Sequence, residues 1–457
     1  MHHLIRFNDS RVISRRFLHD TVRLAERSAF APRTLLPSPP SLGSPLTMWQ
    51  VACTFVAALI CCLVLVVAVI KCWMVFQCIR HSVGRRVPHR LRSAADGTVR
   101  ILSLNLFLRS RGVYDAGTPD DWKASRLDEF LCRYLVDYDV VCLQEVFGVM
   151  STLCARLLDR AEQMGFHWRV VPEHPPMLSR KFMDSGLVIL SRFPILHTET
   201  RMFRSGTHAD KLAAKSFQYC TIDLSSLLDG VPCGETRALG TEMCASPHLL
   251  HVINTHLQSD YQVLDVAALE VKFQQLQQIR DFMNERDLHA SLAPLLLAGD
   301  FNINATVWSP ELTVVPHQVS HAYLRAMRIL GFHACHDVLR PTGLGGRAAT
   351  AFCTYERTGA RRELDSRRRD PDDHELRANP SWVNLARSVD YMWFVPPNTR
   401  WLRLQLPSVR IEKFPMVDPA NKIGGCSDHY GIGVTLEVNK THACCPNCVL
   451  ERSLRSF

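Results

Sequence analysis

Apolar runs of strand length that end in polar side chains recur along most of this chain, and they constrain its fold more than any other feature. Helical periodicity is rarer and is clearest over Leu264–Arg286, with shorter candidates at Leu127–Val136 and His321–Leu330. Many strands with few helices predict mixed sheets packed on each other and covered by helices. The predicted strands are Thr98–Phe107, Asp139–Val146, Phe166–Pro172, Ser185–Phe193, Ser216–Leu224, His248–Leu257, Pro294–Asn302, Val389–Val395 and Tyr430–Val438.

Polar side chains of catalytic type stand at the ends of six of these segments. A single carboxylate at a strand end is commonly a cap or a turn former, so each one alone is weak evidence. Six in order favour a site built along one sheet edge. In chain order they are Asn105, Glu145, His256, Asp300 with Asn302, Asp390, and Asp428 with His429.

The order of these motifs resembles that of the endonuclease/exonuclease/phosphatase superfamily over residues 99–438. The resemblance implies an α/β fold, a DNase I-like four-layer α/β/β/α sandwich, with the active site at one sheet edge. It also implies hydrolysis of phosphate esters with a divalent metal. The motifs that carry it are Leu143-Gln144-Glu145, Thr255-His256, Gly299-Asp300-Phe301-Asn302 and Ser427-Asp428-His429.

Hydrolysis of an anionic phosphodiester requires residues of these types. Magnesium prefers oxygen ligands and needs only one or two carboxylates, so we expect Glu145 and Asn105 to hold Mg²⁺, with Mn²⁺ as an alternative. Histidine titrates near neutrality, so His429 is the expected base for the attacking water, oriented by Asp428 or by Asp390.

Neutral donors to the phosphoryl oxygens should come from two further residues, Asn302 and His256. Asp300 is expected to position the water or the neighbouring charged groups.

A second resemblance concerns the branch of the superfamily. The segment from Asp210 to Lys215 and Ser216 is similar to the Asp-x-x-x-x-Lys-Gly element of neutral sphingomyelinases, with serine in place of glycine. This likeness implies that Asp210 and Lys215 contribute to substrate binding and that Lys215 pairs with Asp300. The segment Phe182–Ser191 is also similar to that branch.

Three alternatives to a sphingomyelinase stay open. Inositol polyphosphate phosphatases of the superfamily carry Trp before Gly-Asp, where this chain has Leu297 and Ala298. Abasic-site endonucleases and secreted nucleases share Ser-Asp-His, so motifs alone do not separate them, although a nuclease gains nothing from a membrane anchor. An inactive membrane scaffold is the alternative from another class.

An uncharged run of twenty residues, Val51–Ile70, is long enough to cross a bilayer as a helix. Positive residues are frequent after the run, whereas only Arg33 precedes it within comparable reach. The positive-inside rule therefore predicts a single-pass protein with a cytosolic catalytic domain. The basic stretch could also contact anionic lipid. Its residues are Lys71, Arg80, Arg85, Arg86, Arg90 and Arg92.

The net charge of +9 suits a phosphate-rich partner or a membrane surface but is too small to indicate nucleic-acid binding. We expect a sphingomyelin-type phospholipase C that releases ceramide and a phosphorylated head group, with the head group itself left open. The expected organisation is a disordered tail at 1–47, a transmembrane helix at 48–79, a basic linker at 80–96, a catalytic domain at 97–440 with a charged loop at 357–380, and a Cys-rich tail at 441–457.

Overall fold

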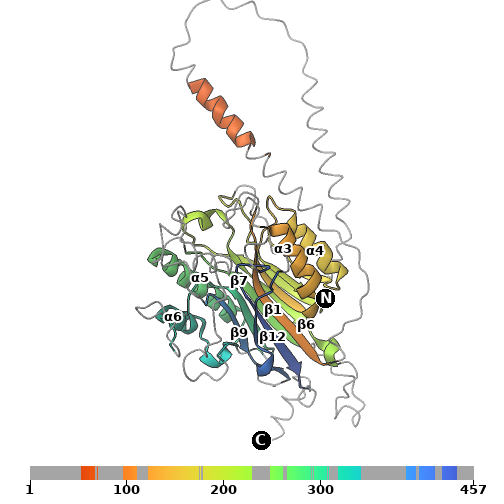
Figure 1. Cartoon of the computed structure of the whole chain (residues 1–457). Helices are drawn as coiled ribbons and strands as arrows, with labels where there is room; N and C mark the ends of the chain where they lie inside the picture. The colour runs from red at the N-terminus through yellow and green to blue at the C-terminus, as the bar shows by residue number, and fades with distance from the viewer. Residues whose placement is uncertain are drawn as a thin grey trace, which may run out of the picture. The chain divides into compact units, whose positions relative to one another are not determined.

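Two β-sheets packed face to face organise the chain from Gly97 to Val438 in this computed structural model (Figure 1). The first sheet has the strand order β10-β12-β1-β2-β4-β3, with β11 paired to β12, and the second has the order β5-β6-β7-β8-β9. The structure describes residues 53–66, 69, 96–110, 122–173, 175, 179–228, 248–260, 265–289, 291, 293–305, 307, 318–340, 388–397, 401–416 and 425–439.

Most strands begin and end within a few residues of the predicted bounds. The strands are β1 Thr98–Leu108, β2 Val140–Val146, β3 Trp168–Val170, β4 Val188–Ser191, β5 Ile195–Met202, β6 Ser216–Asp223, β7 Leu249–His256, β8 Leu295–Asp300, β9 Asp390–Val395, β10 Leu402–Leu404, β11 Arg410–Glu412 and β12 Gly431–Val438.

Helices cover the outer face of each sheet, which completes four layers. Helices α3 (Lys123–Glu129) and α4 (Leu153–Gln163) share an apolar cluster with the first sheet, whereas α5 (Val266–Glu285) and α6 (His321–Leu330) share one with the second. A third apolar cluster fills the space between the sheets. The predicted α/β/β/α sandwich is therefore confirmed. Single helical turns lie at Phe130–Tyr134, Leu135–Asp137, His208–Leu212, Ser225–Leu228, Ala334–His336 and Leu406–Ser408.

The two-residue period of each strand decides which side chains face the other sheet. On β1, Val99 and Ile101 lie in the cluster between the sheets, while Leu102 and Leu104 pack under the helices. The same alternation continues toward Asn105, which is fully buried. The inward face therefore changes from apolar to polar as the strand approaches its end.

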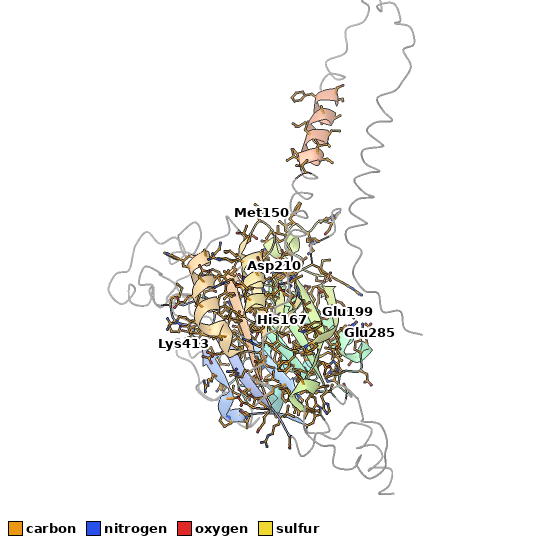
Figure 2. All side chains as sticks on the ribbon, turned by 90° about the vertical axis from the view of Figure 1, so that its right-hand side faces the viewer. Met150, His167, Glu199, Asp210, Glu285 and Lys413 are labelled. Carbon is orange, nitrogen blue, oxygen red and sulfur yellow. The ribbon has the colours of Figure 1, made fainter. Side chains whose placement is uncertain are left out.

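Strands β5, β10 and β11 and helix α4 were absent from the sequence prediction. Strands β10 and β11 have three residues each, too few for a recognisable apolar run. Strand β5 is largely exposed and polar, so it lacks the apolar run of a buried strand. Arg201 on β5 reaches Glu199 on its own strand and Glu285 at the end of α5, each at 2.6 Å, which ties this edge strand to the helix layer. Figure 2 labels the two glutamates, which lie on the same side of the molecule. Helix α4 buries only a narrow stripe, which includes Leu157 and Ala161.

The predicted membrane segment is described only in part. Residues 53–66 are helical and their side chains are exposed. Within the described ranges, no helix combines the length and the hydropathy that a membrane crossing requires. Apart from residue 69, which is helical and exposed, the rest of that segment lies outside the described residues. The tail at 1–47, the linker at 80–95, the loop at 357–380 and the tail at 441–457 also lie outside them.

Close contact between β7 and β8 depends on Gly299. Its φ is +149°, and a Cβ built there would lie 2.0 Å from the carbonyl oxygen of Thr255. Any side chain would push β8 away from β7 at the position before Asp300.

We therefore predict that Gly299→Ala lowers the free energy of unfolding by about 3 kcal/mol or more, because it adds a backbone collision to ordinary overpacking. Urea unfolding in detergent solution measures this. The control is Gly206→Ala, whose Cβ would meet its nearest neighbour at 3.4 Å. Equal stability of the two variants would contradict the close approach.

Candidate active site

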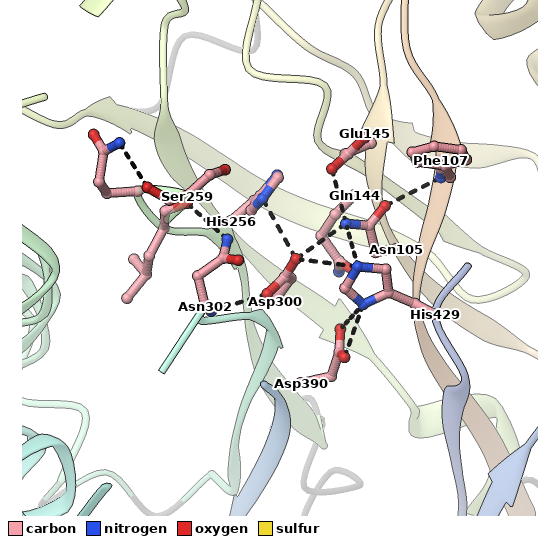
Figure 3. Close-up of polar contacts among 12 residues, drawn as sticks. Asn105, Phe107, Gln144, Glu145, His256, Ser259, Asp300, Asn302, Asp390 and His429 are labelled. Atoms are coloured by element: carbon pink, nitrogen blue, oxygen red, sulfur yellow. Dashed lines mark hydrogen bonds and ion pairs between the residues drawn. The ribbon is translucent and has the colours of Figure 1, made fainter. Parts of the chain in front are cut away.

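Asn105 joins the polar side chains at the common edge of the two sheets (Figure 3). Its side-chain amide donates to Glu145 Oε1 at 3.1 Å and to Asp300 Oδ2 at 3.0 Å, and it lies 3.5 Å from His429 Nε2. Asn105 comes from β1 in the first sheet, while Asp300 ends β8 in the second. The site is therefore built across the seam between the sheets.

Strand register sets the second sheet's share of the site. His256 on β7 pairs with Asp300 on β8, and Asp300 pairs with Asp390 on β9. All three are at most 3% exposed. His256 Nε2 lies 3.4 Å from Asp300 Oδ2. Three adjacent strands thus present an imidazole and two carboxylates in a row.

Two residues of the site, Glu145 and Asn302, have left-handed backbone conformations. Glu145 has φ +56° and Asn302 has φ +51°. By the alternation of β2, Glu145 would point toward the helices, as Leu143 does. The turn at Glu145 instead brings its carboxylate to Asn105. Such conformations cost non-glycine residues of order 1 kcal/mol and are common at functional sites.

His429 is oriented by Asp390. Its Nδ1 lies 2.9 Å from Asp390 Oδ2, whereas the neighbouring Asp428 accepts a hydrogen bond from Ser427 Oγ at 3.3 Å. Burial opposes the charged form of His429, but Asp390 and Asp300 outweigh it and raise the pKa of the imidazole well above its usual value. Of the two aspartates predicted as orienting groups, the structure brings Asp390 to the ring.

An excess of buried carboxylate makes the edge a candidate cation site. Burial and the nearby Asp390 raise the pKa of Asp300. Burial, with a contribution from Glu145, raises the pKa of Asp428 to about 6. Among the described residues, Glu145 Oε2 is buried without a hydrogen-bond partner, and Arg109 Nε lies 3.8 Å from it. Positive charge supplied here would relieve this repulsion, so the residues fit a hard divalent ion.

Two details of this cluster differ from the predicted ligand set. Asn105 turns its amide nitrogen toward Glu145, while its oxygen accepts a hydrogen bond from the Phe107 backbone. Among the described residues, Asp300, Asp390 and His429 offer ligand atoms that all lie within 4.8 Å of one another, and this group does not include Glu145 or Asn105. The contact of His429 with Asp390 is that of a hydrogen-bonded pair. Glu145 and Asp300 are the two carboxylates that share the Asn105 amide.

His256 and Asn302 are held as neutral groups beside Asp300. Burial, followed by the charges of Lys215 and His429, lowers the pKa of His256 well below its usual value. Its Nδ1 is buried without a hydrogen-bond partner. The backbone of Asn302 donates to Asp300 Oδ1 at 2.9 Å, and its side chain donates to the Leu257 carbonyl at 3.3 Å.

The predicted pairing of Lys215 with Asp300 is wrong in this structure. Lys215 Nζ donates to the Leu257 carbonyl at 2.7 Å and lies 3.5 Å from Asp210 Oδ2. Asp210 in turn accepts a hydrogen bond from the Ser259 backbone at 2.8 Å. Lys215 and Asp210 therefore hold the connection after β7 rather than Asp300, because nearer acceptors already satisfy the ammonium group.

Arg126 is a site-positioning residue that the sequence analysis missed. Its guanidinium is fully buried and donates to the carbonyls of Leu106, Phe107 and Cys426 at 2.6 to 3.1 Å. The carbonyls of Leu106 and Phe107 directly follow Asn105 on β1, and that of Cys426 lies three residues before His429. A signal existed in the sequence: Arg126 is four residues before Phe130, which places a cation on the apolar face of this helix.

A buried amide pair crosses between the sheets behind the site. Gln144 Nε2 donates to Asn254 Oδ1 at 2.8 Å, and Asn254 Nδ2 donates to the Leu143 carbonyl at 3.0 Å. Because both residues are fully buried, these bonds hold β2 and β7 at a fixed distance and register. Gln144 was noted only as part of a motif.

Comparison with known proteins identifies the family of this chain. The model of the Endonuclease/Exonuclease/phosphatase family matches residues 117–429, so the chain belongs to that family. Similar proteins include a sphingomyelinase of Dictyostelium discoideum (28% identical over 227 residues, 46% of this chain and 45% of that protein). Sphingomyelin phosphodiesterase 5 of Danio rerio is 33% identical over 179 residues, 36% of this chain and 28% of that protein.

A sphingomyelinase C of Listeria ivanovii is 23% identical over 226 residues, 46% of this chain and 57% of that protein. The matches thus span about half the length of the first two microbial relatives. Among solved structures, SmcL has a TM-score of 0.48 and 19% identity, covering 75% of this chain and 99% of that one.

The two aspartates beside His429 give a direct test of the hydrogen-bond geometry. We predict that Asp390→Asn lowers kcat by about a hundredfold or more, because the imidazole loses both its orientation and its charge partner. Asp428→Asn serves as the matched control and should lower kcat much less. Turnover measured at saturating substrate checks this, and a larger loss in the Asp428 variant would contradict the geometry.

For Arg126, we predict that Arg126→Lys lowers kcat about tenfold with little change in KM. The single ammonium group of lysine cannot bridge three carbonyls as the planar guanidinium of arginine does. The backbone segments that carry Asn105 and His429 should therefore be held less firmly. The same change at Arg133, which is exposed and pairs with Glu129, is the control. Wild-type kcat in the Arg126→Lys variant would show that the bridge is not needed.

Proposed function

We propose that this protein is a divalent-metal-dependent phosphodiesterase of the phospholipase C type that cleaves sphingomyelin or a related sphingophospholipid. The observation that carries the proposal is the meeting of Asn105, Glu145, Asp300 and His429 at one buried sheet edge. Family membership and the sphingomyelinases among the similar proteins support the substrate class.

In this proposal His429 accepts the proton of the attacking water through Nε2. Asp390 holds the other ring nitrogen, which fixes the tautomer and stabilises the charged imidazolium. The charges of Asp390 and Asp300 favour the protonated imidazole. Added positive charge at Glu145 and Asp300 would lower its pKa, so ion binding and base strength are coupled.

Glu145 and Asp300 are the residues proposed to hold the divalent ion, with Asn105 between them. When bound, that ion supplies positive charge against the phosphate as negative charge develops. His256 stays neutral at physiological pH, so it can donate a hydrogen bond to a phosphoryl oxygen without adding charge. Asn302 is proposed as a second neutral donor.

A lipid substrate is favoured over nucleic acid by the apolar helix at residues 53–66, whose side chains are exposed. We propose that this helix belongs to a single membrane anchor, with the catalytic domain on the cytosolic side. An anchor keeps the enzyme in the plane of its substrate and raises the effective substrate concentration.

A substrate panel tests the proposal. Full-length protein with Mg²⁺ is assayed against sphingomyelin, inositol phosphoceramide, lysophospholipids, a phosphoinositide and abasic DNA. We expect phosphorylated head group and ceramide from a sphingophospholipid, and no release after EDTA treatment. Hydrolysis of abasic DNA alone would overturn the proposal in favour of a nuclease.

Removing the carboxylate of Glu145 separates metal binding from folding. We predict that Glu145→Gln weakens Mg²⁺ binding by about tenfold or more and lowers turnover by about a thousandfold, because one hard ligand and its charge are lost. Isothermal titration with Mg²⁺ and head-group release are the measurements. The control is Glu270→Gln, on the exposed surface of α5. Unchanged Mg²⁺ affinity in the Glu145 variant would contradict the ligand assignment.

A further inference from the structure

Exposed apolar side chains gather on the connections that surround the candidate active site. Three large ones extend from the connections at 147–152, 179–187 and 203–215, and a fourth, Met202, is the last residue of β5. Their exposed fractions are 52% for Met150, 45% for Phe182, 44% for Met202 and 48% for Leu212. Solvent exposure of this much apolar surface is unfavourable, and contiguous patches of it commonly mark interaction sites.

Backbone contacts join these connections into one surface, here named the rim. The backbone of Phe182 donates to the Leu212 carbonyl at 2.7 Å, and Ala214 donates to the Met183 carbonyl at 2.8 Å. Met202 pairs with Ser216 at the start of β6. The 147–152 connection is fixed to the same neighbourhood by Asp184, which accepts from the backbone of Gly148 and Val149.

The rim lies at the same edge as the site. The 147–152 connection directly follows β2, which ends beside Glu145, and β4 runs antiparallel to β2, so the residues before β4 return to that edge. Phe217 at the start of β6 pairs with Thr255, next to His256. Figure 2 shows Met150 and Asp210 toward the same end of the catalytic unit, away from Lys413.

The exposed charged side chains of the rim are all positive. Arg180, Arg204 and Lys211 are exposed. Within these three connections the acidic residues are Asp184 and Asp210, and both are buried in hydrogen bonds to backbone amides. The rim therefore presents apolar tips among cationic side chains, the combination that anionic lipid leaflets attract through head groups and acyl chains together.

We propose that the rim is a docking surface for an anionic phospholipid leaflet, with Met150, Phe182, Met202 and Leu212 in the interfacial layer and the basic side chains against the head groups. This inference rests on the proposed function, since docking there would bring the mouth of the site to lipids of the same leaflet. A partner protein would not need cations and apolar tips around a lipid-cleaving site, whereas a charged bilayer satisfies both.

Hydrogen exchange of the full-length protein tests the proposal independently of catalysis. The protein is reconstituted in phosphatidylcholine vesicles with or without phosphatidylserine, and amide exchange is compared with that in detergent. We expect exchange over 147–152, 179–187 and 203–213 to slow about tenfold in phosphatidylserine vesicles and much less in pure phosphatidylcholine. High salt should reverse the difference.

A triple variant, Met150→Ser with Phe182→Ser and Leu212→Ser, should lose this slowing. The matched control is Leu324→Ser with Leu406→Ser, which removes exposed leucines on α6 and near β11. Both variants should retain wild-type thermal unfolding and wild-type turnover of detergent-dispersed substrate. The triple variant alone should hydrolyse vesicle-borne substrate about tenfold more slowly.

Equal slowing in both kinds of vesicle, or retained slowing in the triple variant, would overturn the assignment of the rim to anionic lipid. Failure of the proposed function gives a different result, namely no hydrolysis of any lipid by wild-type protein in detergent or vesicles. In that case the exchange measurements alone still show whether the rim binds anionic lipid.

Discussion

Face-to-face packing of two sheets is the constraint on which the rest of this structure depends. Each strand presents every second side chain to the opposite sheet, and in the middle of the sandwich those positions are apolar, as at Ile101 and Val252. At one edge the same positions become polar, at Asn105, His256 and Asp300. Because the edge is shared by both sheets, residues nearly two hundred positions apart come within hydrogen-bonding distance.

Burying several carboxylates beside one another is costly unless charge and hydrogen bonds compensate. Asn105 supplies hydrogen bonds to two of them, and His429 supplies a positive charge between Asp390 and Asp300. The cluster nevertheless retains unsatisfied acceptor capacity at Glu145. This excess of negative charge relates the structure to the proposed chemistry. The crowded carboxylates oppose folding, but they favour binding of a divalent cation, which in turn favours binding of an anionic phosphodiester.

Sequence periodicity was sufficient for most of the buried strands and for helices α5 and α6. Helix α6 begins and ends at its predicted residues, His321 and Leu330. Its apolar residues recur at a regular helical spacing, and Ser320 before it is a residue type that commonly caps helices. Strand β5 was not predicted because an exposed strand has no apolar run. The polar residues at the strand ends indicated which side chains form the site. The strand register places the ends of neighbouring strands beside one another, as at His256, Asp300 and Asp390. Periodicity carries no information on left-handed turns, so the re-aiming of Glu145 and the partner of Lys215 could not be predicted.

We propose that the seam between the two sheets binds a hard divalent ion at Glu145 and that a lipid phosphodiester is cleaved there. Anomalous diffraction from crystals grown with Mn²⁺ tests it most directly. We expect a peak at direct coordination distance, about 2.1 Å for a small hard ion, from a carboxylate oxygen of Glu145. A peak bound elsewhere, with none at Glu145, would contradict it.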